Sequence, residues 1–109
     1  MKTAHLDDMT RGWLVGDFSP SLYRTQAVEV AVQRRRAGER DPRHFHKIAT
    51  EIVVVVTGRA AMNGVVLGPG DIAVAGPGEP MELEALADGT ATVCVKITGP
   101  RGDKELLES

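Results

Sequence analysis

Residues 38–58 read GERDPRHFHKIATEIVVVVTG, and this stretch decides the fold. Two histidines, His44 and His46, stand two positions apart shortly after Pro42. In an extended strand this spacing turns both imidazoles to one face, with Cα atoms about 7 Å apart. Glu51 follows after a short turn and opens the next apolar run. Two imidazoles and a carboxylate that face one cavity suit Fe(II), Mn(II), Zn(II) or Ni(II), so the stretch predicts a metal site.

Short strand-like runs flank this stretch on both sides. Runs rich in Val, Ile and Thr are separated by Gly, Pro or Asn-Gly about every 8–12 residues, a pattern typical of all-β sandwiches and barrels. Apolar and polar residues alternate in residues 26–33, 81–86 and 92–97, which predicts strands with one buried face. The residues expected on the buried faces are Val28, Val30, Val32, Met81, Leu83, Ala85, Val93, Val95 and Ile97. We expect Cys94 on a less buried face, where it serves packing.

Residues 52–56 are apolar on both faces, which predicts a central strand covered on each side. Its parity carries Val53 and Val55 inward beside Glu51. The pair Asn63-Gly64 separates two short apolar runs. Both residues tolerate positive φ, so the pair predicts a hairpin with a type I′ turn.

Length and charge limit the classes of function. The chain has 109 residues, enough for one domain with one hydrophobic core. Thirteen basic and fifteen acidic side chains give a net charge of −2, which argues against a nucleic-acid partner. No apolar run approaches the ~20 residues that span a bilayer, and the N-terminal residues show no secretion signal. With a lone cysteine, Cys94, we expect a cytoplasmic protein without a membrane partner.

The opening stretch resembles the first motif of the cupin superfamily, which reads Gly, five residues, His, one residue, His, three or four residues, Glu, six residues, Gly. Every interval of that motif is matched by Gly38, His44, His46, Glu51 and Gly58. The match is specific, because a chance hit in a chain of this composition is on the order of one in ten thousand.

Residues 70–78 resemble the second cupin motif, a glycine, an aspartate, a hydrophobic strand and a Pro-x-Gly turn. Gly76 stands where that motif usually has Pro. The family's fourth metal ligand, a His, falls on Met81, and its Asn falls on Ala85. The chain therefore resembles a small single-domain cupin that keeps three of the four metal ligands.

The resemblance implies an all-β fold, the double-stranded β-helix or jelly-roll barrel, which usually forms homodimers. We expect residues 1–25 to form an N-terminal arm on the barrel, residues 26–98 the barrel core and residues 99–109 a C-terminal tail, with a helical turn or frayed end from Asp103. The implied metal ligands are His44, His46 and Glu51. The residues expected to line the pocket are Met81, Val53, Val55 and Leu83.

Two functions stay open. The first is a divalent-metal protein that acts on a small molecule in the barrel cavity, as an oxygenase, isomerase or lyase. Iron, manganese, zinc or nickel is expected, and copper less, although the thioether of Met81 would suit Cu(I). The second is a non-catalytic protein that binds or senses a small ligand and has lost the metal, which Met81 and the lack of an evident acid or base favour. A metal-free sugar epimerase ranks last, because only Asp71 at a turn offers the required Asp.

Other polar and aromatic residues receive no catalytic role. Arg34, Arg35 and Arg36 form a charge run that predicts a solvated strand edge, with contact to a substrate anion as the less favoured alternative. Glu79 is expected to be solvated on its turn, and His5 to be solvated or to contact a second subunit. The aromatic residues expected to pack an N-terminal arm, on the barrel or on a second subunit, are Trp13, Phe18 and Tyr23.

Overall fold

The computed structural model describes residues 1–97 and 104–106. Its strands are β1 Trp13–Val15, β2 Val28–Arg35, β3 Arg40–His46, β4 Thr50–Thr57, β5 Ala60–Met62, β6 Val65–Leu67, β7 Ile72–Ala75, β8 Met81–Ala85, β9 Thr90–Ile97 and β10 Lys104–Leu106. A 3-10 helix at Leu6–Asp8 is the one helix in the described part of the chain. The predicted all-β fold class is therefore confirmed.

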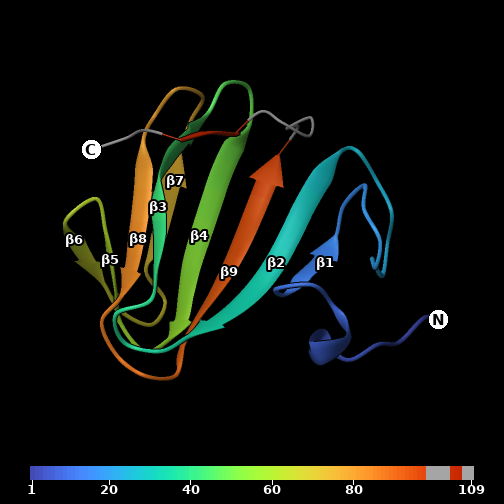
Figure 1. The fold of residues 1–109 in the computed structure, drawn as a ribbon, viewed down its shortest axis with the longest axis horizontal. Coiled ribbons are helices and arrows are strands. Elements are labelled where there is room, and N and C mark those ends of the chain that lie inside the picture. The colour runs from blue at the N-terminus through green and yellow to red at the C-terminus, as the bar shows by residue number, and fades with distance from the viewer. Residues whose placement is uncertain (98–103, 107–109) are drawn as a thin grey trace.

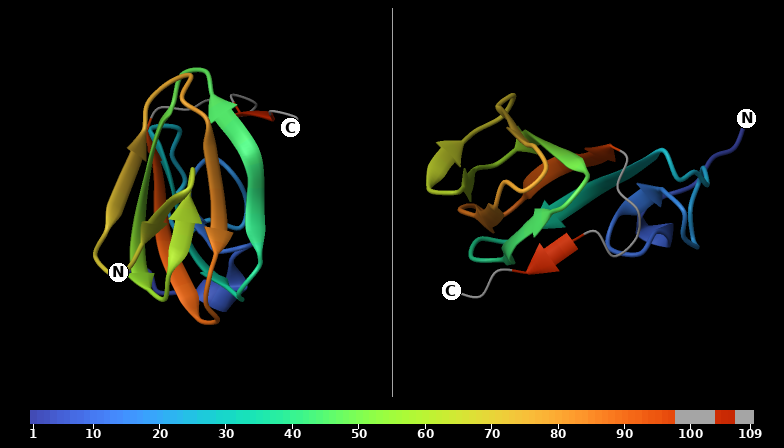
Figure 2. Two further views of the ribbon diagram at one scale, coloured as in Figure 1. Left: turned by 90° about the vertical axis from the view of Figure 1, so that its left-hand side faces the viewer. Right: turned by 90° about the horizontal axis from the view of Figure 1, so that it is seen from above.

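The strands form two five-stranded antiparallel sheets that face each other (Figures 1 and 2). The first sheet has the order β1-β2-β9-β4-β7, and the second has the order β10-β3-β8-β5-β6. Figure 1 shows the N-terminal segment with β1 at the opposite end of the molecule from the β5–β6 hairpin. The chain crosses from the second sheet to the first between β3 and β4. This crossing places the two histidines of β3 and Glu51 of β4 on facing sheets.

Glycine is required at the end of β4. Gly58 has φ +80°, in the region that residues with side chains rarely adopt, and a Cβ atom there would lie 2.6 Å from the Cα of Thr90.

The hairpin predicted at Asn63-Gly64 is confirmed. Asn63 and Gly64 have φ values of 50° and 80°, and they join β5 to β6 with Met62 opposite Val65.

The predicted inward face is right for β8 and wrong for β2 and β9. In β8 the inward residues Met81, Leu83 and Ala85 are buried, as expected. In β2 the fully buried residue is Ala31, while the valines on either side are only partly buried. In β9 the buried residues are Thr90, Thr92 and Cys94, so the expectation of a less buried cysteine is wrong. The barrel interior holds a cavity between these strands, and β2 and β9 contribute mainly polar side chains to its wall.

The valines of β2 and β9 belong instead to an apolar outer face of the first sheet. Cross-strand pairing aligns two rows of apolar residues across β2, β9, β4 and β7. One row is Val30, Val95, Ile52 and Val74, and the other is Val32, Val93, Val54 and Ile72. The β7 end of this face is the most open, since Ile72 is 62% exposed and Val74 is 60% exposed. An apolar sheet face of this kind is characteristic of a surface that contacts another molecule.

The ends of the chain extend both sheets. β1 pairs with β2, and β10 pairs with β3, with Lys104 opposite His46. A strand at Lys104–Leu106 differs from the predicted helical turn or frayed end, because pairing with the edge of β3 decides a segment whose own sequence carries little strand signal. The rest of the predicted tail after Ile97 lies outside the described residues. The described residues include no helix long and apolar enough to cross a membrane.

Candidate metal centre

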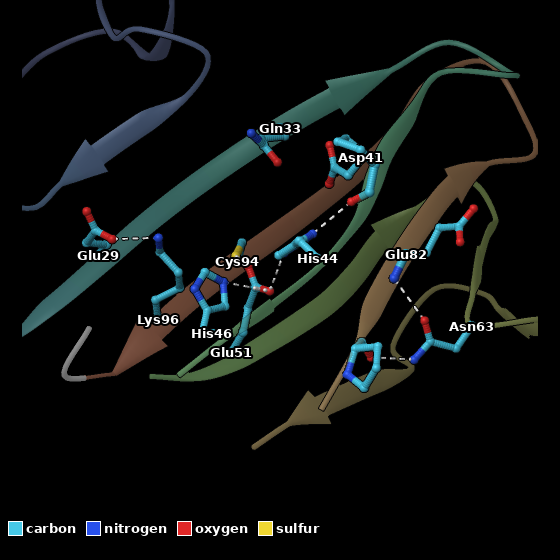
Figure 3. Close-up of polar contacts among 12 residues, drawn as sticks. Glu29, Gln33, Asp41, His44, His46, Glu51, Asn63, Glu82, Cys94 and Lys96 are labelled. Carbon is cyan, nitrogen blue, oxygen red and sulfur yellow. Dashed lines mark hydrogen bonds and ion pairs between the residues drawn. The ribbon is translucent and has the colours of Figure 1, made fainter. Parts of the chain in front are cut away.

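His44, His46 and Glu51 meet between the two sheets. β3 carries the histidines at alternate positions facing inward from the second sheet, and Glu51 faces them from β4 in the first. All three residues are buried. Figure 3 shows their side chains pointing toward one another. The structure therefore brings together the three residues that the sequence predicted as ligands.

The distances within this cluster suit a single metal ion. His44 Nε2 lies 3.4 Å and His46 Nε2 lies 3.6 Å from Glu51 Oε2. One candidate ligand atom from each residue lies within 4.8 Å of the other two. Two donors bound at about 2.1 Å to one tetrahedral ion lie about 3.4 Å apart, close to the spacings of Oε2 from each imidazole nitrogen.

The tautomer of His44 is set by the backbone. Its Nδ1 lies 2.9 Å from the carbonyl oxygen of Pro42. A carbonyl only accepts, so Nδ1 carries the proton and donates it, and in the neutral ring Nε2 turns its lone pair toward the cluster. Metal-binding histidines are oriented in this way by their second nitrogen.

His46 supplies the test of whether a metal fits. Its Nε2 is buried and has no hydrogen-bond partner among the described residues. Buried polar atoms are nearly always paired, and each exception needs an explanation. A cation bound between His44, His46 and Glu51 would give this nitrogen a partner and would also be bound by His44 Nε2 and a carboxylate oxygen of Glu51. The residues present therefore fit a divalent metal ion.

The electrostatics of Glu51 also suit a metal ligand. Burial alone raises the pKa of this carboxyl, but the nearby imidazoles of His44 and His46 and the thiol of Cys94 outweigh the burial and hold the pKa well below its usual range. The group is therefore ionised at neutral pH.

Cys94 is a part of the site that the sequence prediction missed. Its Sγ donates to Glu51 Oε1 over 3.1 Å. Burial and the neighbouring charge of Glu51 raise the pKa of the thiol, so it stays protonated and remains a donor. The sequence offered only the alternation of residues along β9 as a signal. The valines on the other face of that strand favoured the prediction that they, and not Cys94, face inward.

The cluster opens into a cavity of about 210 Å³ between the sheets. Met81, Val53 and Leu83 line this cavity, as the sequence predicted. Val55, the fourth predicted lining residue, is fully buried in the core and is absent from the cavity wall. Met81 lies opposite His44 in the pairing of β3 with β8, so the residue in place of the family's fourth ligand is next to the site.

The prediction that the three arginines at positions 34–36 are all solvated is wrong for Arg35. Arg34 and Arg36 are exposed as expected, but the side chain of Arg35 is only 9% exposed and lines the cavity. Its Nη1 and Nη2 donate to the carboxylate of Asp41 at 2.9 Å each, and Nη2 also donates to Gln33 Oε1 at 2.7 Å. Strand alternation places Arg35 on the opposite face from its two neighbours, but it does not say which face is buried.

Lys96 and Trp13 form a further part of the cavity wall. Lys96 Nζ lies 2.7 Å from Glu29 Oε1, a contact drawn in Figure 3, and 5.2 Å from the centre of the Trp13 ring. Trp13 also packs edge to face with Phe18, as the sequence predicted for this aromatic segment. Tyr23 is 66% exposed.

Similar solved structures share the fold. An uncharacterized conserved protein with a double-stranded β-helix domain from Klebsiella pneumoniae is 28% identical, with 78% of each chain covered and a TM-score of 0.68. The DMSP lyase DddQ from Ruegeria pomeroyi is 21% identical, with 86% of this chain and 49% of that chain covered and a TM-score of 0.69. Oxalate decarboxylase from Bacillus subtilis, which has Mn(II) centres, is 22% identical, with 74% of this chain and 24% of that chain covered and a TM-score of 0.63. No protein-family model and no curated protein matches the chain.

Proposed function

We propose that this chain, a protein of cupin fold, binds one divalent metal ion through His44, His46 and Glu51 and acts on a small molecule in the adjoining cavity. One observation carries the proposal: the buried Nε2 of His46 has no hydrogen-bond partner among the described residues, yet lies 3.6 Å from an ionised carboxylate. The donor set favours Fe(II), Mn(II), Zn(II) or Ni(II). Oxalate decarboxylase supports the choice of metal chemistry, since that neighbour has Mn(II) centres.

An ion held by His44, His46 and Glu51 would supply Lewis acidity to a small molecule in the cavity. The chain itself fixes the ligands. The Pro42 carbonyl orients the ring of His44, and the Cys94 thiol holds Oε1 of Glu51 so that Oε2 faces the histidines. These contacts preorganise the donors before any ion arrives.

The cavity wall controls what reaches this centre. Met81, Val53 and Leu83 present apolar side chains beside the cluster, and all three are buried. An apolar wall lowers the local dielectric and strengthens electrostatic interactions with a bound molecule. A volume of about 210 Å³ is below the roughly 300–1,000 Å³ of drug-sized pockets, so the cavity selects a compact molecule.

Binding without turnover is the second candidate function, and Met81 favours it. This residue is buried opposite His44, where the family has a fourth ligand, and a thioether binds hard or borderline divalent ions poorly. In this case the protein is a sensor or carrier that binds a small ligand in the same cavity. The two candidates differ in whether the purified protein carries a metal.

Elemental analysis of protein purified without added metal tests the proposal. We expect close to one equivalent of a divalent metal per chain in the wild type, and most of it lost in His44→Ala and His46→Ala. His5→Ala is the matched control, because that histidine is exposed and far from the cluster in sequence. Circular dichroism checks that each variant keeps the fold. A wild type that carries no metal, and takes up none of the four candidate ions when they are added, supports the binding protein instead.

A further inference from the structure

We infer that the cavity binds a small molecule bearing a carboxylate, and that Arg35 receives this carboxylate. The inference deepens the proposed function and rests on it for the reacting end of the molecule, which lies toward His44, His46 and Glu51. The anion site itself is argued from Arg35 and its surroundings.

The guanidinium of Arg35 is buried, and its Nε has no hydrogen-bond partner among the described residues. Both Nη atoms donate to Asp41, and Nη2 also donates to Gln33. The Nε–H is buried and has no acceptor among the described residues. A buried donor without an acceptor is costly, and a buried guanidinium usually satisfies its N–H groups in full. An anion that enters the cavity beside Arg35 supplies the missing acceptor.

Arg35 also lines both the metal cavity and a larger surface groove. The groove has a volume of about 490 Å³ and shares Arg11, Gln33, Arg35 and Asp41 with the cavity. Figure 3 shows Gln33 on β2 and Asp41 on β3, the strand that also carries the two histidines. A molecule that entered the cavity from the groove would pass this residue.

The charges along this route favour an anion. The groove is lined by four arginines, which are Arg11, Arg34, Arg35 and Arg40, and by three acidic residues, which are Asp7, Glu39 and Asp41. The cavity is lined by three basic side chains and two acidic ones, and a bound divalent ion would add two positive charges. A positive, partly enclosed path of this kind attracts anions and raises their local concentration.

A carboxylate suits these donors better than a phosphate. A phosphate presents several strongly accepting oxygens and is bound by clusters of donors. Here the basic groups are largely committed, since Arg35 donates twice to Asp41 and Lys96 pairs with Glu29. The unpaired Nε–H and a cavity of about 210 Å³ match a compact monoanion, which reaches Arg35 at one end and the metal centre at the other.

The test uses metal-free protein, so that an anion cannot bind through the metal. Acetate is titrated into ¹⁵N-labelled protein at constant ionic strength, and the Nε–H signal of Arg35 is followed by NMR. Acetamide is the neutral comparator of the same shape, and inorganic phosphate is the comparator for anion class. We expect acetate to shift the Arg35 signal to saturation, acetamide to leave it in place, and phosphate to bind more weakly than acetate.

Variants separate Arg35 from general surface charge. Arg35→Gln should weaken acetate binding about tenfold or more, the loss expected for a charge-assisted hydrogen bond. Arg36→Gln, the exposed next residue, which lines neither the groove nor the cavity, should bind acetate like the wild type. Because Arg35→Gln leaves Asp41 without its partner, the double variant Arg35→Gln/Asp41→Asn repeats the measurement with a neutral pair.

The outcomes distinguish this inference from the proposed metal function. Acetate that leaves the Arg35 signal unmoved, or binds equally well to the variants of Arg35, overturns the inference, and tighter binding of phosphate overturns the carboxylate class. Metal content is measured separately and should be the same in Arg35→Gln and the wild type. If acetate binds at Arg35 in a protein that takes up no metal, the anion site stands and the metal function fails.

Discussion

The thiol of Cys94 on β9 donates a hydrogen bond to Oε1 of Glu51 on the neighbouring strand β4, over 3.1 Å (Figure 3). The bond occupies one oxygen of the carboxylate and leaves Oε2 facing His44 and His46. A buried cysteine therefore orients the single acidic ligand of the candidate metal centre.

Replacing Cys94 separates its hydrogen bond from its packing. Cys94→Ala removes the donor to Glu51, and we expect metal affinity to fall about 10-fold or more, as is usual when a group that orients a ligand is lost. Cys94→Ser keeps a donor at the same position and should retain most of the affinity. Competition with a chelator of known affinity measures both. Equal losses in the two variants would mean that the sulfur contributes through packing alone.

The pKa of Glu51 predicts how acid affects the metal-free protein. Because the folded-state pKa lies below its ordinary value of 4.5, the ionised group stabilises the fold above about pH 4.5. This contribution is lost as the pH falls below that value and approaches the folded-state pKa. Thermal unfolding between pH 7 and pH 3 should show a steeper loss in the wild type than in Glu51→Gln. Identical pH profiles would contradict the lowered pKa.

Met81→His restores the ligand type found in the cupin motif. Since Met81 lies opposite His44 and lines the cavity, we expect the added imidazole to tighten Zn(II) or Fe(II) binding. Leu83→His is the matched control, because Leu83 is the next inward residue of β8 and lies opposite Asp41. Calorimetric titration of both variants measures the effect. Equal gains in both would show that any buried histidine suffices.

The apolar outer face of the first sheet predicts a homodimer, with a second copy covering this face. Ile72 and Val74 are its most exposed members on β7. Ile72→Lys should place a charge in the contact and shift the protein to monomer at micromolar concentration. Val65→Lys is the control, an equally open valine on β6 in the other sheet. Light scattering gives the mass of each, and a monomeric wild type would contradict the prediction.

The sequence predicted the fold and the three candidate ligands because each depends on local spacing. The interval from His44 to Glu51 fixes which walls they occupy, and Asn63-Gly64 fixes a turn by its positive φ values. The inward faces of β2 and β9 were predicted wrongly because the usual rule places apolar residues inside. Here the interior beside β9 is a polar cavity, so Thr92 and Cys94 face inward.

Arg35 was also beyond a reading of local sequence. In a run of three arginines, only the register of β2 and the presence of Asp41 on β3 decide which one is buried. Asp41 lies six residues away and comes close through the turn between the two strands. Residues whose role depends on such pairing become visible only in three dimensions.

Anomalous scattering at the absorption edge of the bound metal tests the central claim most directly. Crystals of the wild type, grown from protein whose metal content has been measured, should give one anomalous peak per chain. We expect that peak about 2.0–2.3 Å from His44 Nε2, His46 Nε2 and a carboxylate oxygen of Glu51. A peak held by other residues, or metal-supplemented crystals with no peak between these three side chains, would contradict the proposed metal centre.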